Sequence, residues 1–542
     1  MKASELLQAW PRDFATESQQ DLSHLAAQSA NGRLALEPHN IRAQILNRDV
    51  SELFFDSRKV QTHSIYIAIR GDKSDGHDFL ENVVRLGADV LVLEDIARVP
   101  SSFGGLIYQV QNTREALARL AAKLYAEPSQ KLFVVGVTGT NGKTTTTYLI
   151  EALLNSVDVP TGVIGTINHH LKDRSWPSEM TTPDPVSFQS RLREFKDLGA
   201  RAVALEVSSH ALAQHRVDSV DFDVAIFTNL TRDHLDYHGS MENYFQAKAR
   251  LFRELLVHSR KNKKVSIING DDPSARELIH GTPASATSEP ATSEVRAALS
   301  ETSMVWRYGM ASGFELKFTP LEMGFGGTRF LLETPHGSRE FKVSMPGLHN
   351  VYNAVAAIGC ALVAGATLDA IAEALTQFSG VPGRLQSVPS ARGIFAFVDY
   401  AHTDDAIRTV LKNLNAIRAS AKLKNRIITV FGCGGDRDRG KRPLMMKAAL
   451  DGSDHVILTS DNPRTEDPIQ IHRDVTVDLD SSLSGVKVFE IVDRRSAMMK
   501  AVSLAQPHDV ILIAGKGHEN YQIVGTTKQP FSDFDIMKEL LA

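Results

Sequence analysis

A loop rich in glycine and threonine, within GVTGTNGKTTTTYLI at residues 136–150, carries the clearest chemical signal in the chain. An apolar run, KLFVVGV, precedes the loop and a segment with helical spacing follows it, which predicts a strand, a turn and a helix. Backbone N–H groups and a helix N-terminus at such a junction form an anion site. Lys143 is placed to reach β- and γ-phosphates, and Thr144 to bind Mg²⁺. The predicted nucleotide contacts are Gly139, Thr140, Asn141, Gly142, Lys143, Thr144 and Thr145.

This loop departs from the usual phosphate-loop pattern at one position. The pattern places a glycine five residues before Gly142, where this chain has Val137, and Gly139 supplies the turn instead. An ordinary glycine-rich turn between a strand and a helix is the alternative interpretation. The GKT sequence between a strand and a helix favours the nucleotide site.

Two further loops offer metal ligands. Glu206 ends the apolar run of VALEVSSH, and His234 lies in NLTRDHLDYHG after the next apolar run. Because the carboxyl ends of parallel strands meet at one sheet edge, these two residues are expected near Thr144, around a metal that bridges nucleotide and substrate. A loop polar group bonded to backbone is the alternative for either residue alone. Lys248 in YFQAKARLF, taken by itself, is typical of a surface lysine on an amphipathic helix.

Alternating apolar and polar segments predict an α/β protein of three domains. Residues 1–130 hold the strand-like runs SIYIAI and ADVLVLE and a helical segment that ends before Pro128. Residues 131–378 alternate strand, loop and helix, which favours a mostly parallel sheet covered by helices on both faces. Residues 379–542 begin at the hinge-like SGVPGR and carry four apolar runs, each ending in a polar loop. The segment 281–300, rich in Ala, Ser, Thr and Pro, is interpreted as a surface insertion.

The bulk composition of the 542 residues is ordinary for a soluble globular protein, with 42% hydrophobic and 23% charged residues. A net charge of −4 provides no basic field for nucleic acid. Two distant cysteines argue against a disulfide framework and fit a reducing compartment. The N-terminal sequence lacks the apolar core of a signal peptide, and no apolar run reaches about 18 residues. We therefore expect a cytoplasmic protein without a membrane span. Separately, we expect a monomer.

Together, these motifs resemble the Mur ligase family, the ATP-dependent amide-forming enzymes of peptidoglycan synthesis. The resemblance spans residues 136–403 and is carried by GTNGKTTT, EVSSH, NLTRDHLDYHG, the lysine of YFQAKARLF, LHNVYN, GVPGR and DYAHT. It implies a UDP-binding N-terminal domain, a central P-loop-type ATPase and a C-terminal Rossmann-like domain that brings the amino acid. FFDSRKV, DGHDF, TTPDP, SDNPR and GKGHENYQ are most similar to loops of members that add the third peptide residue.

The resemblance also implies a reaction. The D-Glu γ-carboxylate of UDP-N-acetylmuramoyl-L-Ala-D-Glu attacks the γ-phosphate of ATP, and the incoming amine attacks the resulting acyl phosphate. Cations must offset the repulsion between a carboxylate and a triphosphate. Lys143 would cover the phosphates, and Mg²⁺ ions would be held by Thr144, Glu206 and His234. In the family the lysine that matches Lys248 is carbamylated, which turns a cation into an anionic ligand for Mg²⁺.

The same resemblance assigns the remaining nucleotide and dipeptide contacts. Asn350 is the expected adenine contact, Asn353 its support, and Arg384 and Asp399 match hinge and nucleotide residues. The expected contacts to the UDP-dipeptide are Ser57, Thr181, Thr182, Ser208 and Arg216. Local turn capping is the alternative for the serines and threonines. Asp404 departs from the family's DYAHTPDA, which has proline at that position.

The SDNPR loop bears on which amino acid is added. Members that add meso-diaminopimelate carry DNPR, whereas members that add L-lysine lack this arginine. A guanidinium can bind the second carboxylate of diaminopimelate bidentately, and it would repel the ammonium end of lysine. The expected diaminopimelate contacts are Arg437, Asp461, Asn462, Pro463, Arg464, Gly515 and Glu519. A salt bridge on a surface loop is the alternative for Arg464.

Other functions fit the sequence less well. DNPR argues against the sister ligase that adds L-lysine, and the uridine-type N-terminal segment argues against a folylpolyglutamate synthase. A P-loop kinase or GTPase belongs to another class, and the NKxD-type guanine loop of a GTPase is missing from the sequence. A non-catalytic binding module is also disfavoured, because the chain has all four of the expected catalytic residues, Lys143, Glu206, His234 and Lys248. FGCGGD lacks the G-x-G-x-x-G spacing of an NAD site.

Overall fold

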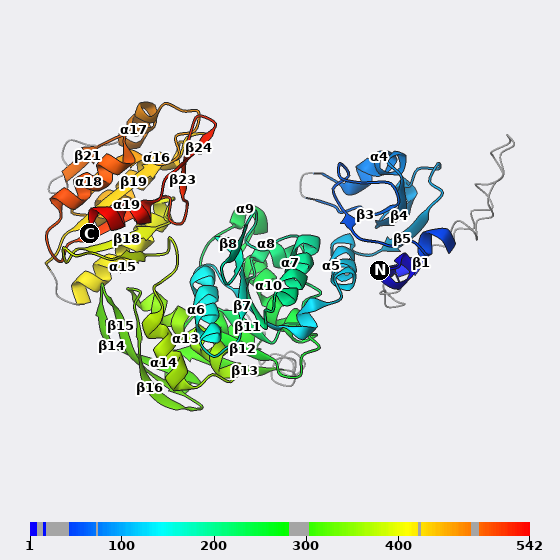
Figure 1. Cartoon of the computed structure of the whole chain (residues 1–542), viewed down its shortest axis with the longest axis horizontal. Helices are drawn as coiled ribbons and strands as arrows, with labels where there is room; N and C mark the ends of the chain where they lie inside the picture. The colour runs from blue at the N-terminus through cyan, green and yellow to red at the C-terminus, as the bar shows by residue number, and fades with distance from the viewer. Residues whose placement is uncertain (8–14, 18–42, 72–73, 281–302, 421–423, 478–486) are drawn as a thin grey trace, which may run out of the picture. The chain divides into compact units, whose positions relative to one another are not determined.

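The computed structural model describes residues 1–7, 15–17, 43–71, 74–280, 303–420, 424–477 and 487–542 (Figure 1). The expected surface insertion at 281–300 lies outside the described residues. The chain forms two compact units: residues 1–140, 159–266 and 274–305 make the first, and residues 141–158, 267–273 and 306–542 make the second. None of the helices that the structure describes is long and apolar enough to cross a membrane.

A five-stranded sheet with the order β1-β5-β4-β3-β2 lies near the N-terminus of the first unit. It is parallel except for β1, and different helices cover its two faces: Leu6 and Leu117 pack in one core cluster, Leu80 and Val83 in the other. The elements are β1 Ala15–Glu17, β2 Leu53–Phe54, β3 Ser64–Ile67, β4 Ala88–Leu93, β5 Leu106–Val110, α1 Ala3–Leu7, α4 Leu80–Arg85 and α5 Thr113–Leu124. The two strands and the helix predicted here are confirmed.

The first unit also holds the strands that precede the phosphate loop and its neighbours, in the order β11-β6-β10-β7-β8-β9. The first four are parallel and fully or nearly fully buried, as expected of strands covered on both faces. Their register places Glu206 beside Val137, and Phe227 beside Thr138. The strands are β6 Phe133–Thr138, β7 Thr161–Ile164, β8 Asn168–Leu171, β9 Arg174–Pro177, β10 Ala202–Glu206 and β11 Val224–Phe227. The helices are α7 Pro185–Asp197, α8 Ser209–Ala213, α9 Leu235–His238, α10 Met241–Arg250, the π-helix Leu251–Leu256 and α11 Ala275–His280.

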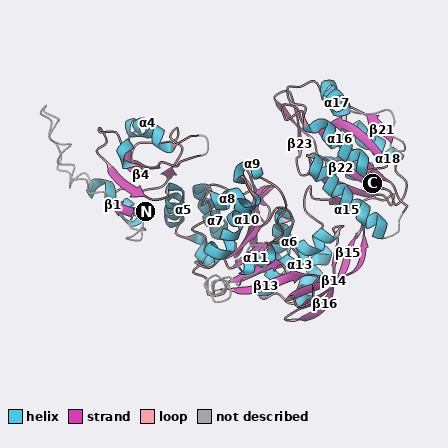
Figure 2. Cartoon of the chain, turned by 180° about the vertical axis from the view of Figure 1, so that it is seen from behind, coloured by secondary structure: helices cyan, strands magenta, loops and turns pink. Residues whose placement is uncertain are grey.

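The second unit contains an antiparallel run of strands that apolar alternation did not predict (Figure 2). Strands β14, β15 and β16 form this run within the order β16-β15-β14-β13-β12. Helix α6 packs against α13 and α14 in the same unit. The elements are β12 Val265–Asn269, β13 Met304–Gly309, β14 Leu316–Gly324, β15 Gly327–Thr334, β16 Gly337–Val343, α6 Lys143–Asn155, α13 Leu348–Val363 and α14 Leu368–Gln377.

The C-terminal sheet of the second unit has the order β17-β18-β22-β19-β20-β21 and is parallel except for β17. Helices α15 to α17 pack on one face, and α18 and α19 on the other (Figure 1). The strands are β17 Gln386–Val388, β18 Phe395–Asp399, β19 Ile427–Cys433, β20 His455–Ser460, β21 Lys487–Glu490, β22 Val510–Ala514 and the hairpin β23 Tyr521–Val524, β24 Thr527–Pro530. The helices are α15 Asp404–Ser420, α16 Lys441–Gly452, α17 Pro468–Thr476, α18 Arg494–Leu504 and α19 Asp533–Leu540. The four predicted apolar runs are β18, β19, β20 and β22, whose carboxyl ends carry the predicted loops.

Candidate functional site

The first half of the phosphate loop is held by the loop that follows β11. Thr140 N donates to Asn229 O over 2.9 Å, and Thr140 Oγ1 donates to Thr231 O over 3.1 Å. Gly139 has φ +150°, and a Cβ there would lie 1.9 Å from Thr228 Oγ1. Only glycine therefore fits where this loop leaves the strand.

The second half of the loop is braced by the two asparagines of LHNVYN. A Cβ on Gly142, whose φ is +88°, would lie 2.4 Å from Asn353 Oδ1. Asn353 Nδ2 in turn donates to Asn350 Oδ1 over 3.3 Å, and Asn350 Nδ2 donates to Pro346 O over 2.8 Å. Both asparagine side chains are buried. Asn353 thus contacts the phosphate loop, whereas an adenine contact for Asn350 stays a prediction.

Helix α6 begins directly after this glycine, with Lys143, Thr144 and Thr145 in its first turn and Asn141 two residues before it. Gly142 is the N-cap and provides no side-chain cap, and the first turn contains no acidic residue. N–H groups at such a helix start suit an anion, and the helix dipole adds to the attraction. The local structure predicted from the sequence is therefore present.

Glu206 is almost fully buried at the end of β10, and a threonine orients its carboxylate. Thr166 N donates to Glu206 Oε1 over 2.9 Å, and Thr166 Oγ1 donates to Oε2 over 3.0 Å. Thr166 Oγ1 also lies 3.0 Å from Thr181 Oγ1, and Thr182 Oγ1 donates to Glu206 O over 2.7 Å. The TTPDP loop and Glu206 therefore form one network, in which Thr166 was not foreseen because no motif marks it.

Of the three other residues expected to bind the dipeptide, Ser208 and Arg216 adjoin this network and Ser57 does not. Ser208 caps α8 by accepting from Ala211 N over 3.1 Å, which is the local role that the sequence left as the alternative. Arg216 Nη1 donates to Thr182 O over 2.8 Å. In the N-terminal sheet's own region, Ser57 lies half-buried in the turn after β2. Substrate contacts of all three stay predictions.

Lys248 is a buried residue, so its interpretation as a surface lysine is wrong. Only 2% of its surface is exposed, and Nζ donates to Gly139 O over 2.9 Å. The ammonium group also lies 4.5 Å from the centre of the Tyr244 ring, a favourable cation–π contact. The Tyr244 hydroxyl lies 3.1 Å from Thr140 Oγ1, and burial raises the pKa of Tyr244 to about 12. Tertiary packing thus brings this lysine to the phosphate loop.

His234 belongs to a cluster of aromatic rings that the sequence did not predict. It precedes α9 in a left-handed conformation, φ +52°, and its side chain is about half exposed. The His210 ring lies 4.8 Å from that of His234 and 4.2 Å from that of Tyr237. Burial, with the nearby positive side chains, lowers the pKa of His238 to about 4, and burial also lowers the pKa of His210. His210 is the last residue of EVSSH, so the motif contained it, but its proximity to His234 depends on folding.

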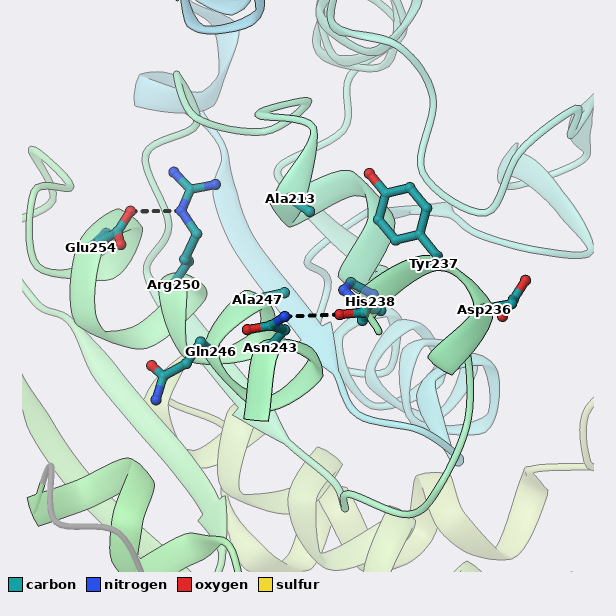
Figure 3. Close-up of a pocket in the computed structure, with 9 residues that line it drawn as sticks. All are labelled: Ala213, Asp236, Tyr237, His238, Asn243, Gln246, Ala247, Arg250 and Glu254. Atoms are coloured by element: carbon teal, nitrogen blue, oxygen red, sulfur yellow. Dashed lines mark hydrogen bonds and ion pairs between the residues drawn. The ribbon is translucent and has the colours of Figure 1, made fainter. Parts of the chain in front are cut away.

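A pocket of about 720 Å³ borders this cluster (Figure 3). Its lining comes from the end of α8, from α9, from α10 and from the π-helix that follows α10: Ala213, Asp236, Tyr237, His238, Asn243, Gln246, Ala247, Arg250 and Glu254. Arg250 Nε donates to Glu254 Oε2 over 2.7 Å, and Asn243 Nδ2 donates to His238 O over 3.0 Å. Its one arginine is therefore already paired with a carboxylate of the same lining.

Asp399 supports the backbone of the expected hinge. Its carboxylate accepts from Leu385 N over 2.7 Å and from Ala401 N over 2.9 Å, and burial raises its pKa. The guanidinium of Arg384 lies 5.4 Å from the centre of the Tyr400 ring. Nucleotide contacts of both residues stay predictions.

Asp404, the departure from the family pattern, is the first residue of α15. Its carboxylate lies 3.6 Å from Arg408 Nη1, one helical turn later. A negative charge at a helix N-terminus is favourable. The departure is therefore accommodated locally.

The DNPR loop is tied to the loop after β22 and to the β23–β24 hairpin. Asn462 Nδ2 donates to Glu519 Oε2 over 3.0 Å, and Ile523 N donates to Asn462 Oδ1 over 2.9 Å. Gly515 has φ +118°, and a Cβ there would lie 2.6 Å from Asp461 Oδ2. Burial raises the pKa of Asp461. Four of the predicted diaminopimelate contacts are thereby brought together.

Arg464, the last residue of DNPR, is held by the β23–β24 hairpin. Its φ of +51° is unusual for a residue with a side chain, and two backbone bonds hold it: N donates to Ile523 O over 3.1 Å and O accepts from Gly525 N over 2.7 Å. Nη1 donates to Gly435 O over 2.7 Å. Pro463 is buried beside it, and Arg437 is exposed in the loop after β19. The alternative of a surface salt bridge for Arg464 is wrong among the residues that the structure describes, where no carboxylate pairs with it.

Known proteins match the chain along most of its length. The Mur ligase family's catalytic-domain model matches residues 49–125, its middle-domain model residues 137–361, and its glutamate ligase domain model residues 383–517. A UDP-N-acetylmuramoyl-L-alanyl-D-glutamate--2,6-diaminopimelate ligase from Geobacter sulfurreducens is 40% identical over 512 residues, which are 92% of this chain and 95% of the relative. The relative of that name from Geobacter metallireducens is 42% identical over 518 residues, covering 93% and 94%.

A solved structure of a ligase with the same name aligns with a TM-score of 0.66 at 35% identity, covering 91% of this chain and 94% of that one. Three successive family matches and this alignment show the three-domain α/β fold that the motifs implied. The chain therefore belongs to the Mur ligase family of ATP-dependent ligases.

Proposed function

We propose that this ligase adds meso-2,6-diaminopimelate to the D-Glu γ-carboxylate of UDP-N-acetylmuramoyl-L-Ala-D-Glu, at the expense of ATP. The acceptor carboxylate attacks the γ-phosphate and releases ADP, the amine then attacks the acyl phosphate, and phosphate leaves as the amide forms. The names of the relatives that match over nine-tenths of the chain support this substrate pair. The step belongs to peptidoglycan precursor synthesis. We propose that the protein acts in the cytoplasm as a monomer.

The observation that carries the choice of amino acid is the state of the Arg464 guanidinium. Its hydrogen bonds to the described residues all use Nη1, which contacts Gly435 O and Asn462 O. Nε and Nη2 have no partner among the described residues, and these two N–H groups point the same way, as a bidentate carboxylate pair requires. Diaminopimelate has a distal carboxylate for this pair, whereas L-lysine ends in an ammonium that the guanidinium would repel.

Lys143 and the start of α6 supply positive potential for the triphosphate in this proposal. Phosphoryl transfer between two anions depends on such fixed charges and dipoles. Lys248 holds the loop from beneath through Gly139 O. If it is carbamylated, as the family resemblance implies, it exchanges this donor role for that of an anionic ligand.

Mg²⁺ is the proposed metal, with Thr144, Glu206, His234 and carbamylated Lys248 as its protein ligands. No group of three or more His, Cys, Asp or Glu side chains that could hold a metal occurs in the described part of the chain. A hydroxyl and a buried carboxylate nonetheless fit Mg²⁺, which usually takes one or two protein oxygens together with phosphates and waters. When bound, the ion offsets the negative charge of the phosphates and of the acceptor carboxylate.

The proposed domain boundaries are those of the sequence: 1–130 for the UDP-binding domain, 131–378 for the ATPase domain and 379–542 for the amino-acid domain. Phosphate release with ATP, Mg²⁺ and the UDP-dipeptide, supplied with meso-diaminopimelate or with L-lysine, tests the function. We expect turnover with diaminopimelate alone. Turnover with lysine alone would overturn the argument from Arg464, and turnover with neither would overturn the reaction itself.

A further inference from the structure

Lys516, which no prediction above assigns, is fully buried in the loop that contains two of the predicted diaminopimelate contacts. It lies between Gly515 and Gly517, whose φ angles of +118° and +54° turn the loop sharply. A Cβ on Gly517 would lie 2.7 Å from the Tyr400 side chain. The backbone is therefore folded tightly, and the lysine side chain points into the protein rather than into solvent.

The buried ammonium group makes two hydrogen bonds, both to residues expected to bind the amino acid. Lys516 Nζ donates to Asn462 Oδ1 over 3.1 Å and to Glu519 Oε2 over 2.9 Å. Asn462 Nδ2 donates to the same Glu519 oxygen over 3.0 Å. The three side chains thus form a closed triangle. A buried charge is tolerated only with such partners, which makes the triangle hard to rearrange.

The lysine determines which way the Asn462 amide faces. Lysine nitrogen can only donate, and so can Ile523 N, which lies 2.9 Å from the same oxygen. Both donors require the amide oxygen at this end. The Asn462 NH₂ group must then face Glu519. One of its two N–H groups donates to Glu519, and the other makes no hydrogen bond to the residues that the structure describes.

The lysine also determines which oxygen of Glu519 faces outward. Both bonds to this carboxylate end on Oε2, and Oε1 receives none from the residues that the structure describes. The side chain is about one-fifth exposed. Oε1 is therefore left to accept from a ligand ammonium group, while Oε2 is held inside.

We propose that Lys516 is a positioning residue for the amino-acid substrate, acting through Asn462 and Glu519. It fixes one Asn462 N–H and one Glu519 carboxylate oxygen that make no hydrogen bond to the residues that the structure describes, and these match the carboxylate and the ammonium of an α-amino acid centre. This role rests on the proposed function, because it assumes that the DNPR loop and the loop after β22 bind the amino acid.

The test compares Lys516→Met with Lys528→Met. Lys528 lies in exposed β24, and its Nζ is 4.4 Å from the centre of the Tyr521 ring, whereas Lys516 Nζ is 5.4 Å from the same ring. The control therefore loses a lysine beside the same aromatic ring without touching the triangle. Losing an orienting bond to a charged group corresponds to roughly a 10- to 100-fold effect on affinity.

We expect Lys516→Met to raise KM for meso-diaminopimelate about 10- to 100-fold while KM for ATP and for the UDP-dipeptide stays within about twofold. Lys528→Met should change none of the three constants. A Lys516→Met enzyme with unchanged KM for diaminopimelate, or with all three KM values raised alike, would overturn the positioning role. If Lys516→Met does not fold, the same three KM values are measured for Lys516→Gln, which keeps a donor without the charge. The same outcomes then support or overturn the positioning role.

The wild-type enzyme separates the two proposals. If it uses L-lysine and not diaminopimelate, the proposed substrate is wrong, and the positioning role is then judged on KM for lysine. If it uses diaminopimelate but Lys516 variants keep a normal KM, the substrate stands and only the positioning role fails.

Discussion

Replacing Arg464 tests the central specificity argument. Arg464→Met removes the two N–H groups, Nε and Nη2, that have no partner among the described residues. A charge-assisted hydrogen bond contributes about 1.5–3 kcal/mol. With each bond taken at the lower end of this range, the loss of two bonds costs about 3–4 kcal/mol of binding free energy. This corresponds to a fall of about 10²- to 10³-fold in kcat/KM for diaminopimelate.

The assay is phosphate release at saturating ATP and UDP-dipeptide, with diaminopimelate varied. Arg464→Lys keeps the charge but loses the planar pair of donors, so we expect it to fall between wild type and Arg464→Met. Both variants also lose the bond from Nη1 to Gly435 O, worth about 1 kcal/mol, so unfolding temperatures are measured in parallel.

Arg495→Met is the matched control, because Arg495 pairs with Glu539 on the surface of α18 and α19. Its kcat/KM should match that of wild type. The reasoning is refuted if Arg464→Met retains kcat/KM for diaminopimelate within about threefold of wild type, which is less than the roughly 1 kcal/mol that a typical neutral hydrogen bond contributes.

Four further outcomes are expected. Lys248→Met should lose about 1–3 kcal/mol of stability with the donor to Gly139 O and nearly all turnover, measured by denaturation and phosphate release; wild-type turnover would contradict it. Gly142→Ala, strained at φ +88° and crowding Asn353, should lower stability by about 1–3 kcal/mol and raise KM for ATP; an unchanged KM would show that the loop adapts. Chelation of Mg²⁺ by EDTA should abolish turnover, and excess Mg²⁺ should restore it; turnover in EDTA would exclude the proposed metal. Burial, with the charges of Arg191 and His170, lowers the pKa of His169 from 6.5 to about 4. At pH values between these two pKa values, the unfolded chain binds more protons than the folded one. The free energy of unfolding therefore falls as the pH drops from 6.5 to 4, by on the order of 2 kcal/mol after solvent screening. Urea denaturation of His169→Phe at pH 5 and 7 should show a smaller difference than wild type; an equal difference would refute this contribution.

The sequence predicted best those elements whose signal is local. Strands such as β10 and β22 are buried on both faces and read as continuous apolar runs. The strands β14 to β16 were missed because they alternate exposed and buried residues, and Pro320 interrupts the first of them. A weak, interrupted alternation of this kind resembles a loop in sequence.

The candidate site divides in the same way. Gly142, Lys143 and Thr144 were found because a turn and a helix start are made by neighbouring residues. Lys248 could be assigned only through family resemblance, since its sequence context is that of an exposed helix. Its burial against Gly139 follows from packing between segments more than 100 residues apart, whereas Tyr244 lies one turn away on the same helix.

By itself, the sequence determined the fold class, the phosphate loop and, through its motifs, the family. Only the tertiary structure decided that Asn353 excludes a side chain at Gly142, and that Lys516 donates hydrogen bonds to Asn462 and Glu519. The reason is physical: hydrogen-bond periodicity and turn geometry act between near neighbours and leave a pattern in the chain. The direction in which a buried polar group faces depends on donors and acceptors that arrive from distant segments, and no local pattern records them.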